Sequence, residues 1–470
     1  MSPHSHADTT TPPAPVPPPG SRTAEGTHLM HRSLKVEPAM VESASRLTLH
    51  LSDGRAVLDA CGGAAVAIIG HGNDEVAKAM ARQAARVSYV HTQSYTTPAA
   101  EDLANFLLEG SPHGLEKAFF VCSGSEAVEA ALKLARQYFY EKGETQRVHF
   151  VSRKQSYHGN TMGSLSVSSN LARKVPYQDF GYQHVSHVSP AYAYRYKRDG
   201  ETMEDFTTRL LEELETEFLS VGPSRVIAFI AEPVGGATAG CLPPPPGYLR
   251  GVRALCDKYG ILLILDEIMC GTGRCGTYFA FEQEDGVTPD LVTVAKGLGG
   301  GYCSIAAVLA HKRVVDVLRR GTSSFNHGHT YQAHPIACAT ALAVQTIVRR
   351  DGLVARCAAM GRLLEAKLRA ALAGCPSVGD VRGRGLFWAV EFVRDRETKE
   401  TFDPAVTFGI KVQQTAFEGG VAIYPGWTTV DGTKGDHILL APPFTVTEEE
   451  LDTIVRVLKE AITTQERIHM

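Results

Sequence analysis

The sequence lacks several patterns that mark particular classes of protein. Its ten cysteines are scattered between positions 61 and 375, and no two have the C-x-x-C spacing of zinc or redox sites. The longest apolar runs, such as Ile261 to Leu265, are far shorter than the ~20 residues of a membrane span. No basic block interleaved with aromatic residues occurs, and 47 Lys+Arg stand against 51 Asp+Glu. We therefore expect reduced thiols in a cytoplasmic protein, no bound metal, no membrane association and no nucleic-acid partner.

The first residues lack the features of a folded segment. Met1 to Gly20 is rich in Pro, Thr and His and has neither an apolar segment nor an Arg-rich amphipathic pattern. We predict a disordered leader over residues 1–27; an organelle address or a surface arm is the alternative. The whole sequence is 44% hydrophobic, and the remaining chain is long enough for about two domains.

Apolar runs alternate with amphipathic helices through the middle of the chain. Beyond residue 117 this alternation predicts βαβ units, hence an α/β fold with a mostly parallel sheet flanked by helices. Earlier, residues 48–59 form a hairpin pattern around Asp53-Gly54. The C-terminal part predicts a smaller α+β domain with long helices from Pro335 and a last helix over residues 448–462. The predicted division is 28–74 for the first part of the small domain, 75–335 for the large domain and 336–470 for the rest of the small domain.

Ser123, Gly124 and Ser125 follow a predicted strand, and a helix is expected to open at Glu126. Backbone N–H groups at a helix N-terminus, with a glycine that permits close approach, form a natural phosphate site. The alternative is that one serine only caps the helix. A second motif, Tyr157-His158-Gly159, could stack on a planar heterocycle, although the motif alone favours a core tyrosine and a satisfied histidine.

Chemically active side chains follow two apolar runs that predict buried strands. Asp266 and Glu267 end the run "ILLILDE", where a carboxylate could hold a protonated pyridine nitrogen; the same pattern occurs in ATP sites, but the chain has no G-x-x-x-x-G-K-[ST] loop. Lys296 ends "DLVTVAKG", where burial would lower its pKa and make it a competent Schiff-base amine, unless it is solvated like most strand-end lysines.

These four motifs, in this order, resemble the class III (subgroup II) aminotransferases, from about His28 to Ile462. The resemblance implies PLP fold type I and a pyridoxal 5′-phosphate (PLP) cofactor held by Lys296 as a Schiff base. It also implies roles for single residues: phosphate binding by Gly124 and Ser125, ring stacking by Tyr157 with His158 beside it, contact with the pyridine nitrogen by Asp266, and contact with the opposite ring face by Ile268. Glu232 resembles the glutamate at the substrate side of the ring, and Thr330 the threonine that reaches the phosphate in the neighbouring subunit of a homodimer with shared sites.

The implied reaction is a ping-pong transfer of an amino group from a small-molecule amine donor to a carbonyl acceptor, a keto acid or aldehyde, with Lys296 as the proton carrier. Decarboxylating transamination and an aminomutase reaction, which occur on the same fold, are alternatives. An unrelated nucleotide-binding or structural α/β protein is a third.

The sequence departs from the family pattern around the substrate. Met269 stands where many relatives have Gln, and Ala64 and Ala65 stand where ω-transaminases often have an aromatic wall. The loop "IYPGWTTVDGTKGDH" has no arginine where many ω-aminotransferases bind the acceptor's carboxylate. Lys434, Arg382 and Arg384 are the candidate substitutes, with a structural role more typical of the two arginines. We expect a roomier pocket and a primary amine or ω-amino donor with an apolar body.

Overall fold

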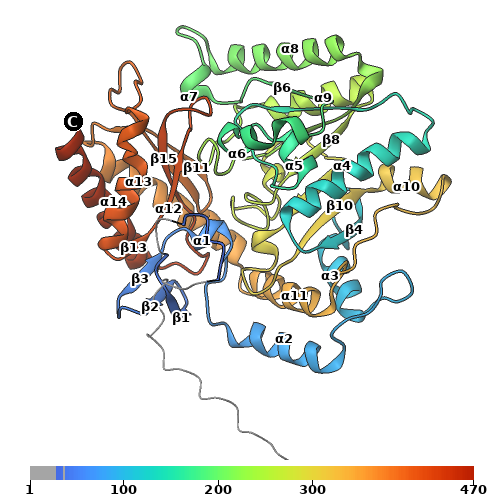
Figure 1. Cartoon of the computed structure of the whole chain (residues 1–470), viewed down its shortest axis with the longest axis horizontal. Helices are drawn as coiled ribbons and strands as arrows, with labels where there is room; N and C mark the ends of the chain where they lie inside the picture. The colour runs from blue at the N-terminus through green and yellow to red at the C-terminus, as the bar shows by residue number, and fades with distance from the viewer. Residues whose placement is uncertain (1–27, 35–37) are drawn as a thin grey trace, which may run out of the picture.

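The computed structural model describes residues 28–34 and 38–470, so the leader predicted over residues 1–27 lies outside the described residues. A seven-stranded sheet in the order β4-β10-β9-β8-β7-β5-β6 forms the centre of the molecule (Figure 1). Five neighbouring strands run parallel to one another, which confirms the predicted mostly parallel α/β sheet. The strands of this sheet are β4 (Leu115–Val121), β5 (His149–Arg153), β6 (Val185–Val188), β7 (Val226–Ala231), β8 (Leu262–Asp266), β9 (Leu291–Val294) and β10 (Ala306–His311).

Strand β10 runs against its neighbours. It pairs antiparallel with β4 on one side and with β9 on the other. The apolar run that forms it gives no information on strand direction, because direction depends on the path of the connection and not on side-chain periodicity. The sequence therefore predicted the sheet but not this reversal.

Helices cover both faces of the central sheet, and each face has its own apolar cluster. Because both faces are covered, strands β7, β8 and β9 are buried along their whole length, which explains their continuous apolar sequences. One face holds α4 (Gly124–Glu141), α5 (Met162–Val167) and α10 (Lys312–Arg320); the other holds α3 (Pro98–Leu108), α8 (Met203–Val221) and α9 (Tyr248–Tyr259). Helices α2 (Asp74–Arg86) and α11 (Pro335–Arg350) pack against each other at one edge (Figure 1).

Helix α4 begins two residues earlier than the predicted opening at Glu126. Ser123 is its N-cap: the Ser123 hydroxyl accepts from the Glu126 N–H at 3.3 Å, and the Glu126 carboxylate accepts from the Ser123 N–H at 2.9 Å. This capping box satisfies two N–H groups that would otherwise lack partners. Gly124 and Ser125 are consequently the first two residues of the helix.

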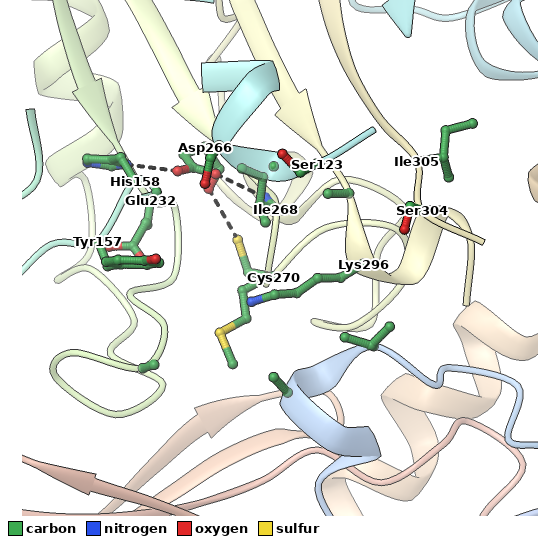
Figure 2. Close-up of a pocket in the computed structure, with 18 of the residues that line it drawn as sticks. Ser123, Tyr157, His158, Glu232, Asp266, Ile268, Cys270, Lys296, Ser304 and Ile305 are labelled. Atoms are coloured by element: carbon green, nitrogen blue, oxygen red, sulfur yellow. Dashed lines mark hydrogen bonds and ion pairs between the residues drawn. The ribbon is translucent and has the colours of Figure 1, made fainter. Parts of the chain in front are cut away.

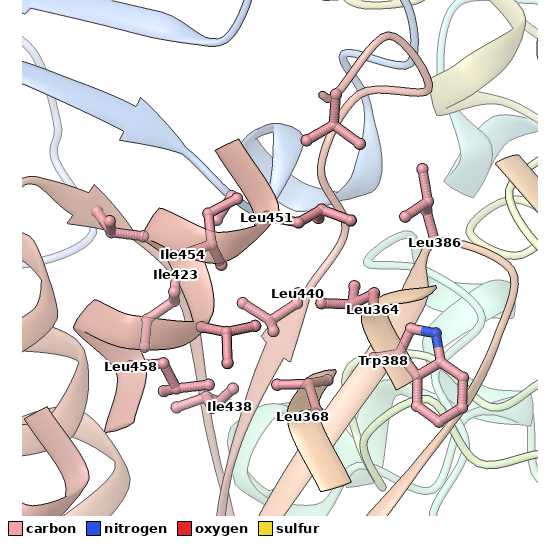
Figure 3. Close-up of a cluster of buried hydrophobic side chains, with 14 of the residues drawn as sticks. Leu364, Leu368, Leu386, Trp388, Ile423, Ile438, Leu440, Leu451, Ile454 and Leu458 are labelled. Atoms are coloured by element: carbon pink, nitrogen blue, oxygen red, sulfur yellow. The ribbon is translucent and has the colours of Figure 1, made fainter. Parts of the chain in front are cut away.

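The C-terminal part forms a second sheet, in the order β11-β12-β15-β14, packed on three helices. Figure 3 shows its apolar core, in which Leu364 and Leu368 meet Ile438, Leu440 and Leu458. The elements are β11 (Val378–Arg384), β12 (Phe387–Phe392), β14 (Tyr424–Trp427), β15 (Asp436–Leu440), α12 (Leu353–Leu372), α13 (Phe408–Glu418) and α14 (Glu448–His469).

The predicted end of the last helix at Ile462 is wrong, because α14 continues to His469. Its last turns carry Glu466, whose carboxylate accepts from the N–H and the hydroxyl of buried Ser377 at 2.9 and 2.7 Å. The sequence beyond Ile462 is polar, but these buried contacts hold it in the helix. No helix in the part of the chain that the structure describes has the length and hydropathy to cross a bilayer.

A third sheet joins strands from the N-terminal and C-terminal parts of the chain. The predicted hairpin forms β2 and β3 around Gly54, whose φ of +86° suits a tight turn, and β3 pairs parallel with β13 from the C-terminal part. The division into a small and a large domain at residues 74 and 335 stays a prediction. The remaining elements are β1 (Val41–Ser45), β2 (Thr48–Leu51), β3 (Ala56–Asp59), β13 (Val421–Ala422), α1 (Gly62–Ala65), α6 (Leu171–Lys174) and α7 (Ala193–Tyr196), with short 3-10 turns at Val175–Phe180, Pro223–Arg225, Ala280–Gln283, Lys296–Leu298 and Pro404–Val406.

Candidate active site

A cavity of about 350 Å³ lies at the carboxyl ends of the parallel strands. The segments that follow β4, β5, β7, β8 and β9 form its walls, and α1 and β14 contribute the opposite side. Figure 2 shows side chains from these segments around one space. Open α/β sheets bind ligands at this edge, and the volume suits a small organic molecule.

Asp266 ends β8 at the cavity, and three donors fix its buried carboxylate. His158 Nδ1 lies 2.8 Å from Oδ2, while the Thr293 hydroxyl and the Ile268 N–H each lie 3.1 Å from Oδ1. A carboxylate only accepts hydrogen bonds, so the His158 proton sits on Nδ1. The arrangement presents a negative charge of fixed orientation to the cavity.

Glu267, the next residue, does not line the cavity. Its carboxylate accepts from the N–H groups of Ala280 and Phe281 at 2.7 and 2.8 Å and so orders the segment after β8. Burial raises the pKa of Glu267 to about 8, although the two N–H donors act in the opposite direction. Of the two acidic residues that end the strand, only Asp266 faces the site.

Lys296 follows β9, and its side chain extends into the cavity (Figure 2). Burial lowers the pKa of Lys296 to about 8, while the carboxylates of Asp266 and Glu232 act in the opposite direction. The residue has φ +44°, a left-handed conformation that side-chain-bearing residues rarely adopt and that occurs at functional sites. The amine is therefore partly neutral near neutral pH, as a nucleophile or base requires.

Glu232 and Tyr157 line the side of the cavity toward which the Lys296 amine points (Figure 2). The Glu232 carboxylate accepts from the N–H of Gly236 at 2.8 Å and of Tyr157 at 3.3 Å. Burial raises the pKa of Glu232, and the nearby Asp266 charge acts in the same direction. The site thus contains two carboxylates held by different partners.

The N-terminus of α4 forms another wall, with Ser123, Gly124 and Ser125 lining the cavity. A Cβ added at Gly124 would lie 2.9 Å from Cδ1 of Ile268, so a larger residue here would require Ile268 to shift. The Ser123 hydroxyl caps the helix, as the structural alternative had it, and the Ser125 hydroxyl accepts from the Asn160 N–H at 3.0 Å. The first N–H groups of α4 suit an anion such as a phosphate.

Several candidates from the sequence lie elsewhere. Thr330 is exposed and does not line this cavity. Arg382 is buried and pairs with Glu391 at 2.6 Å, Arg384 pairs with Glu284 at 2.8 Å, and Lys434 lies outside the cavity. The two arginines thus have structural partners instead of facing a substrate.

The wall expected from residues 64 and 65 is only half correct. Ala64 lines the cavity, whereas Ala65 is buried in an apolar cluster and does not line it. Met269 also lines the cavity, in the position the sequence suggested for a departure from the family pattern.

Sequence reasoning missed several residues of the site, among them three polar ones. Thr293, which holds Asp266, is the one polar residue in the buried strand β9, and that isolated hydroxyl was a usable signal. Arg32 and Arg173 line the cavity, but both come from segments without a motif. Their arrival depends on the path of the chain, which side-chain patterns do not encode.

Comparisons with known proteins agree with this geometry. The family model for class-III aminotransferases matches residues 30–462. A Schizosaccharomyces pombe protein described as an uncharacterised aminotransferase is 48% identical over 94% of this chain and 96% of its own. An (S)-enantioselective ω-transaminase from Thermomicrobium roseum is 35% identical, with a TM-score of 0.86 over 93% of this chain and 96% of its own. An amine transaminase from an uncultivated Pseudomonas species, solved in its PLP-bound form, is 31% identical, with a TM-score of 0.87 over 95% and 99%. The chain belongs to the class-III aminotransferase family and has PLP fold type I.

Proposed function

We propose that this transaminase moves the amino group of a primary amine or ω-amino compound to a keto acid or aldehyde in two half-reactions at the cavity around Lys296. The donor is oxidised to a carbonyl compound, and the acceptor is reduced to an amine. The observation that carries the proposal is the convergence of a partly neutral lysine, a buried fixed carboxylate and a helix N-terminus on one cavity.

The residues of the cavity fit the PLP cofactor of the family. The first N–H groups of α4, at Gly124 and Ser125, would hold its phosphate, and Asp266 would pair with its pyridine nitrogen. Tyr157 and Ile268 would contact its ring, and Lys296 would hold its carbonyl carbon. When bound, PLP serves as an electron sink that makes a hydrogen on the substrate's amine-bearing carbon acidic.

The chain's own side chains then have defined tasks. Lys296 Nζ takes a proton from the amine-bearing carbon of the donor in the first half-reaction. It returns a proton to the corresponding carbon of the acceptor in the second half-reaction. The lowered pKa of Lys296 permits both transfers. Asp266 keeps its negative charge directed at the cavity, and the His158, Thr293 and Ile268 donors prevent it from turning away. Glu232 orders the backbone at Tyr157 and Gly236, which form the adjoining wall.

The donor proposal rests on the apolar lining. Ala64, Val66 and Val234 line the cavity together with Met269, and the small side chain of Ala64 leaves room for an apolar substituent. Glu232 and Asp266 are the carboxylates of the cavity, and both already have backbone or side-chain partners. A primary amine with an apolar body fits these walls better than a polycationic donor.

We also propose a cytoplasmic homodimer with shared sites, in which Thr330 reaches the phosphate of the neighbouring subunit's cofactor. The exposure of Thr330, away from its own subunit's cavity, supports this role. Mixing a Thr330→Ala chain with a Lys296→Ala chain tests this role. In a heterodimer, the site that keeps Lys296 would receive Thr330 from the other chain, so one of the two sites should be complete.

The central experiment uses the PLP-loaded protein with a panel of amine donors, followed by the loss of its visible absorbance as the amino group reaches the cofactor. Transfer to an added keto acid or aldehyde should consume donor and acceptor one to one, and Lys296→Ala should lack both the borohydride-sensitive yellow colour and activity. Released carbon dioxide, or turnover of one substrate without an acceptor, would instead indicate decarboxylation or an aminomutase. A wild-type protein that stays colourless with PLP would overturn the assignment of the site.

A further inference from the structure

Arg173 is a charged residue of the cavity wall that the reaction described above does not use. It lies in the four-residue helix α6, which follows the segment after β5. Its guanidinium lies 4.6 Å from the ring centroid of Tyr157. Stacking on an aromatic face holds the planar group in one orientation and leaves its N–H edges available.

Helix α6 is fixed on the wall of the cavity by its neighbours. The Asn170 side chain donates to the Thr238 hydroxyl at 3.3 Å, and Lys174 Nζ donates to the carbonyl oxygens of Ser166 and Ser168 at 2.7 and 3.0 Å. Contacts of Asn170, before Arg173 in the sequence, and of Lys174, directly after it, therefore fix the backbone position of Arg173.

The same helix packs against the loop of residues 428–435, which carries no arginine. A Cβ added at Gly432 would lie 2.9 Å from Cδ1 of Leu171, so the loop and α6 are in close contact. The cation of this loop, Lys434, lies outside the cavity and 4.0 Å from Asp431. Positive charge therefore enters this part of the cavity from α6 and not from the loop.

The Arg173 guanidinium has no hydrogen bond or ion pair with any residue that the structure describes. The two carboxylates of the cavity, Asp266 and Glu232, bind other groups instead. Arg173 and Lys296 line the same cavity, and the Arg173 charge adds to the effect of burial, which lowers the pKa of Lys296. An unpaired cation in the wall of the cavity that holds the reacting amine favours a substrate that carries a negative charge.

We propose that Arg173 binds the carboxylate of the amino acceptor, so that the acceptor is a 2-oxo acid and not an uncharged aldehyde or ketone. This inference rests on the proposed transaminase function and makes its acceptor specific. The planar guanidinium offers two parallel N–H donors to a carboxylate, which an ammonium group does not. A donor without a carboxylate would use only the apolar wall around Ala64.

The experiment compares PLP-loaded wild type, Arg173→Met, Arg173→Lys and the control Lys434→Met, with a primary amine donor and two acceptors. Pyruvate carries a carboxylate and propanal does not. Arg173→Met should raise the KM for pyruvate about 10- to 100-fold, as expected for the loss of charge-assisted hydrogen bonds, and change kcat/KM for propanal less than about threefold. Arg173→Lys should recover part of the loss, and Lys434→Met should match wild type.

A binding measurement supplies a readout apart from turnover. Propanoate, an unreactive carboxylate, should bind the PLP-loaded wild type in calorimetry and bind Arg173→Met about 10-fold or more weakly. Equal losses for pyruvate and propanal, or unchanged propanoate binding, would overturn the inference. So would a selective loss in Arg32→Met but not in Arg173→Met, because Arg32 is the other arginine that lines the cavity.

The two proposals fail separately. Wild-type protein that transfers no amino group to either acceptor contradicts the proposed function, whereas propanoate binding still decides the role of Arg173. Visible absorbance of each PLP-loaded variant shows whether the site is intact. If Arg173→Met does not fold, Arg173→Lys and Arg173→Gln carry the same comparison with pyruvate and propanoate.

Discussion

His158 Nδ1 lies 2.8 Å from Asp266 Oδ2, and both side chains are buried. The histidine thus fixes one oxygen of the carboxylate, while Thr293 and the Ile268 N–H fix the other. Nε2 of His158 has no hydrogen-bond partner among the described residues, so the hydrogen bond of the ring's other nitrogen, Nδ1, is the one to Asp266. The pair acts as one preorganised acceptor at the end of β8.

Asp266→Asn should lower kcat/KM by about 100- to 1,000-fold, because a neutral amide cannot present the negative charge that the site is built around. Glu267→Gln is the matched control one residue away. It should lose about 1–3 kcal/mol of unfolding free energy, since one amide N–H₂ would face a backbone N–H donor, and should keep most of its activity. Steady-state kinetics and denaturant unfolding of both variants check the prediction. Equal kinetic losses would contradict the separate roles.

The sequence was sufficient for the parts of the site that follow strands. Asp266 and Lys296 each come directly after an apolar run, and parallel strands bring their carboxyl ends to one edge of the sheet. The same reasoning could not locate Arg173, because α6 reaches the cavity through contacts with Thr238 and the loop of residues 428–435. Charge patterns show that a residue is polar, but only the path of the chain decides which cavity it faces.

Tertiary contacts also determine that Arg382 has a structural role. Two arginines in "VRGRG" looked available for a carboxylate, but Arg382 contacts Glu391, Tyr192 and the Gly240 carbonyl inside the protein. These partners lie up to 190 positions away in the sequence. No local pattern distinguishes an arginine that will meet such partners from one that will face a substrate.

The rate at which the PLP-free protein captures added PLP should rise with pH through about 8 and then level off. Only the neutral amine of Lys296 attacks a carbonyl carbon, and burial lowers its pKa from 10.5 to about 8. An ordinary exposed lysine would give a rate that still increases above pH 9. Stopped-flow absorbance between pH 6 and 10.5 distinguishes the two profiles, with Lys296→Ala as the blank.

The same pKa affects stability in a defined direction. The folded state of the PLP-free protein gives up the Lys296 proton near pH 8, whereas the unfolded state keeps it until about 10.5. Between these values the unfolded state binds more protons, so unfolding free energy should rise with pH relative to Lys296→Met. Denaturant unfolding of the two proteins at pH 7, 8.5 and 10 measures this difference. An unfolding free energy that stays constant or falls with pH relative to Lys296→Met would mean that Lys296 is not buried as described.

Gly124→Ala should destabilise the protein by about 1–3 kcal/mol and weaken PLP binding, because the added methyl would lie 2.9 Å from Cδ1 of Ile268. Ile268→Val removes that carbon, so the double variant should recover part of the loss and give a favourable coupling energy. Gly374→Ala is the control, since a Cβ there meets nothing within 4 Å. Unfolding curves and PLP titrations of the wild type and the four variants test the contact. Additive effects of the two substitutions would contradict it.

Ala64→Phe should narrow the cavity and discriminate between donors by size. Ala64 lines the cavity, so a phenyl group there would occupy space that we assign to the donor's apolar body. We expect kcat/KM for 1-phenylethylamine to fall about 10- to 100-fold while that for isopropylamine changes several-fold less. Ala77→Phe, at an exposed position of α2, controls for adding an aromatic residue. A uniform loss for both amines would indicate damage to the cofactor site and place the donor's apolar body away from Ala64.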